Sequence, residues 1–177
     1  MSKRTIARRG RTLLCVALLM ATVGCDRITK HLASVALDGE PPRSYVSGVV
    51  RLEYAENTGA FLSIGAGLPE STRTLILEFG VGLLLLAIGV AAFKYQLRGR
   101  ALLGVALIWA GGASNLFDRI VHGSVVDFIN VGVGGLRTGI FNVADVAIFL
   151  GVVLFATARS VDPNVDSTGR IGTAPSP

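Results

Sequence analysis

Two acidic residues stand alone in apolar stretches of this sequence. Asp145 is the only charged residue in the apolar run 141–158, and Asp127 lies within the sequence VVDFI at 125–129. Two carboxyl groups that approach within about 3 Å share one proton. One of them can then take a proton from water while the other donates a proton to a carbonyl oxygen. If the fold brings them together, Asp127 and Asp145 are candidates for hydrolysing a peptide bond by general acid and base.

Other polar residues lie near the same ends of the apolar runs, at helical spacing. The pairs are Asp26 with Lys30, Asn115 with Arg119, and Asn142 with Asp145. Spacings of three and four residues predict that each pair shares a helix face. Ionisable side chains at membrane depth cost a few kcal/mol each, so they mark a functional site or buried ion pairs that staple the helices together. Both interpretations remain open at this point.

Metal and nucleophile chemistry have little support. The two histidines, His31 and His122, do not form an HExxH sequence, and the two cysteines form no ligand cluster. No serine has a histidine or lysine at a spacing that suggests a nucleophile and its base. We therefore expect no metal site and no cofactor.

The composition requires a membrane to position these residues. Of 177 residues, 51% are hydrophobic and 16% are charged, with a mean hydropathy of +0.59. A soluble domain has roughly 25% charged residues, so a soluble enzyme is excluded, as are a disordered chain and a disulfide scaffold. The net charge is +5, but the basic residues flank apolar runs and form no basic face, so we expect no nucleic-acid partner.

The apolar runs predict a membrane all-α fold with four transmembrane helices and a small β element. A transmembrane helix needs about 20 mostly apolar residues. The predicted spans are about 12–37, 72–93, 101–119 and 141–158. Lys and Arg are concentrated at the N-terminus and between the second and third spans, so the positive-inside rule places both termini in the cytoplasm.

The segments on the outer side follow from this topology. The segment 41–68 is rich in Val, Tyr, Leu and Phe between Pro and Gly turn signals, which predicts one or two β-strands. The segment 120–140 is interpreted as the outer connection between the last two spans. We expect residues 1–159 to form a single four-helix membrane domain, and residues 160–177 a disordered cytoplasmic tail.

The N-terminus has a second interpretation. Basic residues, an apolar run and the sequence TVGC at 22–25 follow the order of a secretory signal ending in a lipobox. A secreted lipoprotein would continue as a soluble domain, whereas three further membrane-length runs follow here. We therefore favour a first transmembrane helix.

Five sequence strings together resemble signal peptidase II, the bacterial lipoprotein signal peptidase family. In chain order they are DRITK at 26–30, NTGAF at 57–61, GGASNLFDR at 111–119, VVDF at 125–128 and FNVAD at 141–145. The likeness extends over roughly residues 13–159. Two departures stand out: Gly59-Ala60 runs straight to Phe61 where the family has a second Ala, and Ser114 replaces a usual Gly, which adds a side chain at a packed helix contact.

The resemblance implies an aspartyl endopeptidase of the bacterial inner membrane that cuts a prolipoprotein just before its diacylglyceryl-modified Cys. The site would lie at the extracytoplasmic interface, beneath a β cradle, and globomycin would block it. Asp127 and Asp145 match the family's catalytic pair. Residues matching its substrate-binding or supporting positions are Asn57, Asn115, Arg119, Asn142, Asp26 and Lys30. The expected partners are lipid-modified prolipoproteins and membrane lipid, and we expect a monomer.

Two other functions are compatible with acids at membrane depth. A small transporter or channel subunit could relay protons through Asp26, Asp127 and Asp145, but such a path needs polar residues along the inner halves of the helices. Residues 101–112 and 146–156 contain no charge. A purely structural membrane protein would lose only stability when these acids are replaced.

Overall fold

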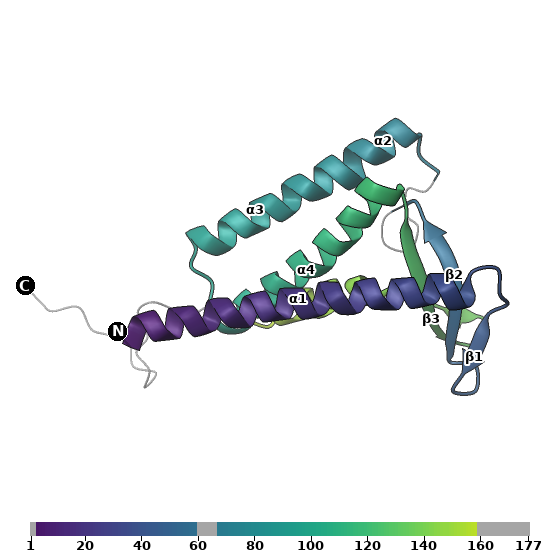
Figure 1. Cartoon of the computed structure of the whole chain (residues 1–177), viewed down its shortest axis with the longest axis horizontal. Coiled ribbons are helices and arrows are strands. Elements are labelled where there is room, and N and C mark those ends of the chain that lie inside the picture. The colour runs from purple at the N-terminus through teal and green to yellow at the C-terminus, as the bar shows by residue number, and fades with distance from the viewer. Residues whose placement is uncertain (1–2, 60–66, 159–177) are drawn as a thin grey trace, which may run out of the picture.

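The computed structural model describes residues 3–59 and 67–158, and its helices run side by side with one β-sheet across the end opposite the N-terminus (Figure 1). Residues 160–177, the predicted tail, lie outside the described residues. The helices are α1 (Lys3–Leu37), α2 (Glu70–Thr74), the π-helical turn η2 (Leu75–Gly80), α3 (Val81–Lys94), α4 (Gly99–His122) and α5 (Val143–Ala156).

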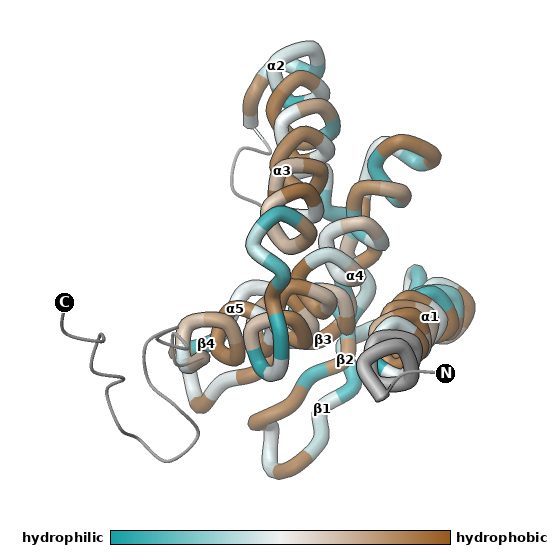
Figure 2. Tube along the Cα trace, turned by 90° about the vertical axis from the view of Figure 1, so that its left-hand side faces the viewer, coloured by the Kyte–Doolittle hydropathy of each residue, from teal (hydrophilic) through white to brown (hydrophobic). Residues whose placement is uncertain are grey.

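The helices belong to a membrane-type fold. Within the described part of the chain, three helical segments are long and apolar enough to cross a membrane: Gly10–Leu37, Glu70–Lys94 and Gly99–His122. Val143–Ala156 is a shorter apolar helix. Large apolar side chains such as Leu83, Phe93 and Phe149 are exposed on the helix surfaces, and Figure 2 shows hydrophobic residues, in brown, along the helices. A soluble monomer rarely exposes so much contiguous apolar surface.

Small residues allow α4 and α5 to pack closely. A Cβ atom on Gly111 would lie 2.4 Å from the Ala144 carbonyl oxygen, and one on Gly104 would lie 2.7 Å from that of Gly151. Those distances are shorter than any real contact, so only glycine permits this approach of the two backbones. Close approach through small residues is the usual basis of helix packing in membranes.

The sheet has four antiparallel strands in the order β1 (Arg43–Tyr45), β2 (Val50–Asn57), β3 (Val125–Val133) and β4 (Leu136–Arg137). The two strands in the segment 41–68 confirm the sequence prediction. The connection 120–140 contains two further strands that were not predicted, β3 and β4, and its β-branched run pairs with β2 across the sheet. The register between β2 and β3 shifts between Leu52 and Ala55.

Several helix ends differ by a few residues from the predicted spans, and α1 begins nine residues earlier, at Lys3; two of the differences bear on the site. Helix α4 continues past Arg119 to His122 and ends at Gly123, whose φ of +72° is the left-handed conformation that favours glycine at a helix C-terminus. Helix α5 begins at Val143 rather than at 141, because Asn142 is its N-cap. Asp145 is therefore the third residue of α5.

Candidate active site

Asp127 is held in the sheet between two asparagines from other elements. It lies in β3 opposite Ala55 of β2, and its side chain is 2% exposed. Asn57 Nδ2 donates to its Oδ2 at 2.8 Å, and Asn142 Nδ2 donates to its Oδ1 at 2.6 Å. Asp127 stands alone in its apolar run, but the fold supplies hydrogen-bond partners that lie 70 and 15 residues away along the chain.

Asp145 is fixed by the N-terminus of α5. Its backbone N–H donates to Asn142 Oδ1 at 3.0 Å, and its Oδ2 accepts the Asn142 backbone N–H at 3.2 Å, which is a capping box. Asn115 Nδ2 of α4 donates to Asp145 Oδ1 at 2.9 Å. The spacing of Asn142 and Asp145 therefore reflects a helix cap rather than a shared helix face.

Asn142 joins the two carboxylates, and its amide has one possible orientation. Its Oδ1 accepts the Asp145 N–H, so its Nδ2 must face Asp127. Asn57 is oriented in the same way, because its Oδ1 accepts the Gly59 N–H at 2.9 Å. The structure thus places Asp127 and Asp145 on either side of Asn142, with asparagine amides directed at both carboxylates.

The electrostatics of Asp127 favour a retained proton. Burial raises the pKa of Asp127 to about 6, and the nearby charge of Asp145 raises it as well. The hydrogen bonds from Asn57 and Asn142 oppose this shift, since they stabilise the carboxylate. Asp127 therefore gains and loses its proton much nearer to neutral pH than an exposed aspartate.

A second buried polar cluster lies beside this pair. Asp26 is fully buried, and its Oδ2 lies 2.6 Å from Lys30 Nζ, which confirms the predicted pairing. Its Oδ1 accepts the backbone N–H of Ala144 at 2.9 Å. Because Ala144 precedes Asp145 at the start of α5, the Asp26 carboxylate holds the helix end that carries Asp145 and faces the positive end of its dipole.

Lys30 and Asn115 connect the two clusters. Lys30 Nζ donates to Asn115 Oδ1 at 2.8 Å, and the same oxygen accepts Asn142 Nδ2 at 3.3 Å. A continuous chain of hydrogen bonds therefore runs from the Asp26–Lys30 ion pair to the carboxylate pair. Asn115 and Asn142, two of the candidate site residues, both belong to this chain of hydrogen bonds.

Sequence reasoning missed two members of this network, Asp118 and Arg27. Asp118 Oδ2 lies 2.7 Å from Lys30 Nζ, and its Oδ1 forms an ion pair with the Arg27 guanidinium. The guanidinium also lies 4.5 Å from the centre of the Phe117 ring. One feature of the sequence could have indicated Arg27: it lies three residues before Lys30 and therefore near the same face of the helix.

Ser114 is accommodated by a polar partner. Ser114, which stands where the family usually has glycine, is buried at the contact between α1 and α4. Its Oγ donates to Asp26 Oδ2 at 2.7 Å. The departure from the usual glycine therefore adds a third donor to the buried carboxylate of Asp26.

Arg119 reaches from α4 to the chain that follows β2. Its Nη2 donates to the Gly59 carbonyl oxygen at 2.6 Å, and its Nη1 donates to the Asn115 carbonyl oxygen at 3.3 Å. It thus contacts the segment that orients Asn57. Ala60 and Phe61, the site of the other departure from the family pattern, lie outside the described residues.

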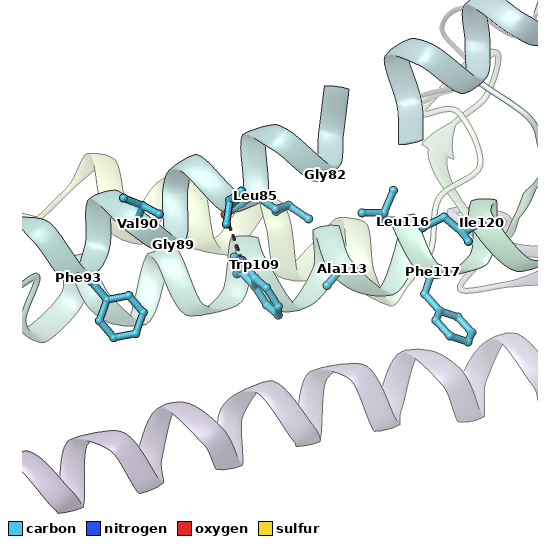
Figure 3. A pocket seen from close by; sticks show the side chains of 11 residues that line it. Gly82, Leu85, Gly89, Val90, Phe93, Trp109, Ala113, Leu116, Phe117 and Ile120 are labelled. Carbon is cyan, nitrogen blue, oxygen red and sulfur yellow. Dashed lines mark hydrogen bonds between the residues drawn. The ribbon is translucent and has the colours of Figure 1, made fainter. Parts of the chain in front are cut away.

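An apolar groove runs along α3 and α4, with a volume of about 500 Å³. Figure 3 shows Leu85, Phe93 and Trp109 lining it, with α1 passing opposite, and Phe117 and Ile120 at the end nearer the sheet.

Within the part of the chain that the structure describes, no three His, Cys, Asp or Glu side chains gather in a way that could hold a metal ion.

The fold and the site define a membrane protein with two aspartates near the sheet end of its helices, one buried and one half-buried, that are bridged by hydrogen bonds through Asn142. A sequence profile of the family signal peptidase (SPase) II matches residues 18–160, and the chain belongs to this family of aspartic peptidases. Membership of this family favours the peptidase over the transporter or channel subunit.

Individual relatives agree with the family match. The lipoprotein signal peptidase of Sphingopyxis alaskensis is 34% identical over 149 residues, covering 83% of this chain and 82% of that protein. The lipoprotein signal peptidase of Nostoc punctiforme is 36% identical over 146 residues, covering 82% of this chain and 88% of that protein. A bacterial membrane enzyme solved by the in meso method at 1.9 Å has the same fold, with a TM-score of 0.70 and 24% identity over 81% of this chain and 90% of that chain.

Proposed function

We propose that this protein cleaves the signal peptide from diacylglyceryl-modified prolipoproteins just before the lipidated Cys, with Asp127 and Asp145 as the catalytic pair. Membership of the signal peptidase II family supports the substrate class. The observation that carries the assignment of the pair is the bridge through Asn142, whose side chain donates to Asp127 and accepts from Asp145.

The chemistry begins with the pair holding one proton. The ionised carboxylate removes a proton from water while the water oxygen attacks the scissile carbonyl carbon. The protonated carboxyl group donates its proton to the carbonyl oxygen, so that a neutral tetrahedral intermediate forms. When the C–N bond breaks, the departing amine nitrogen takes the proton that was removed from water. One hydroxyl group of the intermediate gives its proton to the ionised carboxylate as the carbonyl re-forms, so the pair again holds one proton. The raised pKa of Asp127 suits the proton-holding role.

Asn57, Asn115 and Asn142 keep this pair in position, since each donates a side-chain N–H to a catalytic carboxylate. Arg119 holds the segment beyond Asn57 through Gly59. Asp26 and Lys30 act from further away, through Ala144 and Asn115. None of these roles requires a metal ion or other cofactor.

The proposed topology is a single domain of residues 1–159 with four spans, both termini in the cytoplasm, and the sheet end of the helices outside the inner membrane. The basic N-terminus and the basic connection between α3 and α4 support this orientation. Helix α5 has 14 residues, about 21 Å at 1.5 Å per residue, against a hydrocarbon core of about 30 Å. Close packing against the longer α4 supports α5 as the fourth span.

The groove along α3 and α4 suits the apolar helix of the signal peptide. Its lining is apolar along its length, and α1 passes opposite it (Figure 3). Its end at Phe117 and Ile120 lies on the same turns of α4 as Arg119. A helix lying there would present its C-terminal end, and thus the scissile bond, toward the carboxylate pair. One copy of the chain contains every residue of the site, so we propose a monomer.

The test is cleavage of a diacylglyceryl-modified prolipoprotein by the purified protein in detergent. Wild type should cut the lipidated substrate before its Cys and leave the unlipidated precursor intact. Asp127→Asn and Asp145→Asn should each abolish cleavage, whereas Asp38→Asn, which changes an exposed carboxylate after α1, should retain it. Cleavage by either catalytic variant at a rate near wild type would overturn the assignment of the pair.

A further inference from the structure

Exposed apolar side chains gather at the tips of both β-hairpins. Tyr45 and Val46 at the β1–β2 turn are 48% and 72% exposed. Val133 and Leu136, which pair across the β3–β4 turn, are 73% and 86% exposed. Together these four residues form what we call the tip patch.

The two hairpin tips lie side by side because Arg137 fastens them together. Its Nη1 donates to the Gly48 carbonyl oxygen at 2.9 Å, and its Nε donates to Asn130 Oδ1 at 2.6 Å. The Gly132 N–H donates to the Val49 carbonyl oxygen at 2.9 Å. The guanidinium thus binds the backbone of one hairpin and a side chain of the other, and the exposed apolar residues of both turns lie at the same end of the sheet.

The backbone conformation of the β1–β2 turn is unfavourable for Val46. The φ angles of Val46 and Ser47 are +51° and +52°, a region in which a β-branched residue is an outlier. Gly, Asn and Asp are the usual residues of such hairpin turns. Because this strained residue is also an exposed apolar one, we infer that its side chain has a function at the tip of the turn.

The position of the turn shows what lies next to it. In Figure 1 the β1–β2 turn is at the level of the last turns of α1 rather than beyond the helix end, and it is displaced to one side of the helices. The view along the helices in Figure 2 places the same turn outside all of them, with hydrophobic residues at its tip. At that level α1 still exposes Leu32 and Val35, so its surroundings are apolar.

We infer that the tip patch inserts into the interfacial layer of the lipid bilayer and anchors the sheet beside the helices. The patch lies at the level of the last turns of α1 (Figure 1), where exposed apolar side chains of the helix would contact lipid. Tyr is a residue typical of membrane interfaces. Anchoring at the tips would hold β2 and β3, and with them Asn57 and Asp127, against the membrane surface. The inference needs only that the helices span a bilayer, and it does not depend on the peptidase chemistry.

The experiment uses the full-length protein in phosphatidylcholine nanodiscs, with Cys15 and Cys25 replaced by Ala. A single cysteine with a fluorescent probe is placed at Ser47, inside the turn but outside the patch, or at the exposed control position Glu40. Quenching by iodide reports contact with water, and quenching by doxyl-labelled lipid reports contact with the bilayer. We expect iodide to quench the probe at Glu40 several-fold more strongly than the probe at Ser47, and the labelled lipid to quench mainly the latter.

Patch variants separate anchoring by the protein from insertion of the probe itself. Val133→Ser combined with Leu136→Ser should remove the protection of the Ser47 probe, whereas Leu68→Ser, at an exposed apolar residue outside the hairpins, should leave it intact. Equal iodide quenching at Ser47 and Glu40, or protection that survives the double substitution, overturns the inference. Protection from iodide without quenching by lipid would indicate a protein contact and would overturn it as well.

Discussion

Replacing Lys30 by Met tests whether the buried charge cluster stabilises the fold. Lys30 is 4% exposed, and its Nζ lies 2.6 Å from Asp26 Oδ2 and 2.7 Å from Asp118 Oδ2. Met has a similar length and carries no charge, so the substitution leaves two buried carboxylates without their shared cation. The chain of hydrogen bonds to Asn115 loses its donor at the same time.

The expected cost follows from the remaining partners. Removing one member of a buried ion pair costs about 3–5 kcal/mol. Asp26 keeps its hydrogen bonds from Ser114 and Ala144, and Asp118 keeps its ion pair with Arg27, so we expect a value of about 3 kcal/mol, at the low end of that range. At about 2–4 °C per kcal/mol for a chain of this size, the midpoint of thermal unfolding should fall by roughly 6–12 °C.

The assay is thermal unfolding in detergent, followed by circular dichroism. Lys94→Met, at an exposed lysine that ends α3, is the matched control and should unfold with wild type. Adding Asp26→Asn to Lys30→Met removes one of the two uncompensated charges, so the double variant should be more stable than Lys30→Met alone. If Lys30→Met unfolds with the control, or if the second substitution brings no recovery, the cluster does not stabilise the protein in the way argued here.

Three further substitutions test the geometry of the site. Because the pKa of Asp127 is raised from 3.8 to about 6 on folding, wild type should lose up to about 3 kcal/mol of stability as pH rises from about 4 through 6. Asp127→Asn should lack this loss, so its stability relative to wild type should increase over that interval in unfolding measurements; a constant difference would contradict the assignment. Gly111→Ala places a Cβ atom 2.4 Å from the Ala144 carbonyl oxygen, so it should lower the free energy of unfolding by about 1–3 kcal/mol and reduce peptidase activity. Gly24→Ala, where a Cβ atom would meet nothing within 4 Å, is the control and should change neither the unfolding midpoint nor the cleavage rate. Ser114→Ala removes a donor to the buried Asp26 carboxylate and should lower the free energy of unfolding by about 1.5–3 kcal/mol, and an unchanged unfolding midpoint would show that this hydrogen bond contributes nothing.

Features local in the sequence were predictable from it. The lengths of the apolar runs predicted the three long helices and the approximate position of the fourth, because a span is set by the number of consecutive apolar residues. The i,i+4 spacing predicted that Asp26 and Lys30 would pair on α1. Turn signals on both sides of a β-rich stretch predicted the strands of the segment 41–68.

The second half of the sheet was not predictable in this way. The sequence of β3 is a short apolar run with one acid, which periodicity alone cannot distinguish from a buried loop or a helix. It becomes a strand because β2, about 70 residues earlier in the chain as measured from Asn57 to Asp127, provides its backbone partners. The same pairing brings Asn57 to Asp127.

The amino-acid sequence by itself indicated a membrane protein, the approximate spans, the family strings and the two aspartates that we propose as the catalytic pair. The tertiary structure decided how those aspartates are held: Asn142 caps α5 and joins them, while Asp26 reaches Ala144 from a helix 118 residues earlier. Sequence spacing describes contacts within a single helix or turn. Contacts between elements depend on which faces pack together, and in this protein that packing is set by the close approach of α4 and α5 at their glycines.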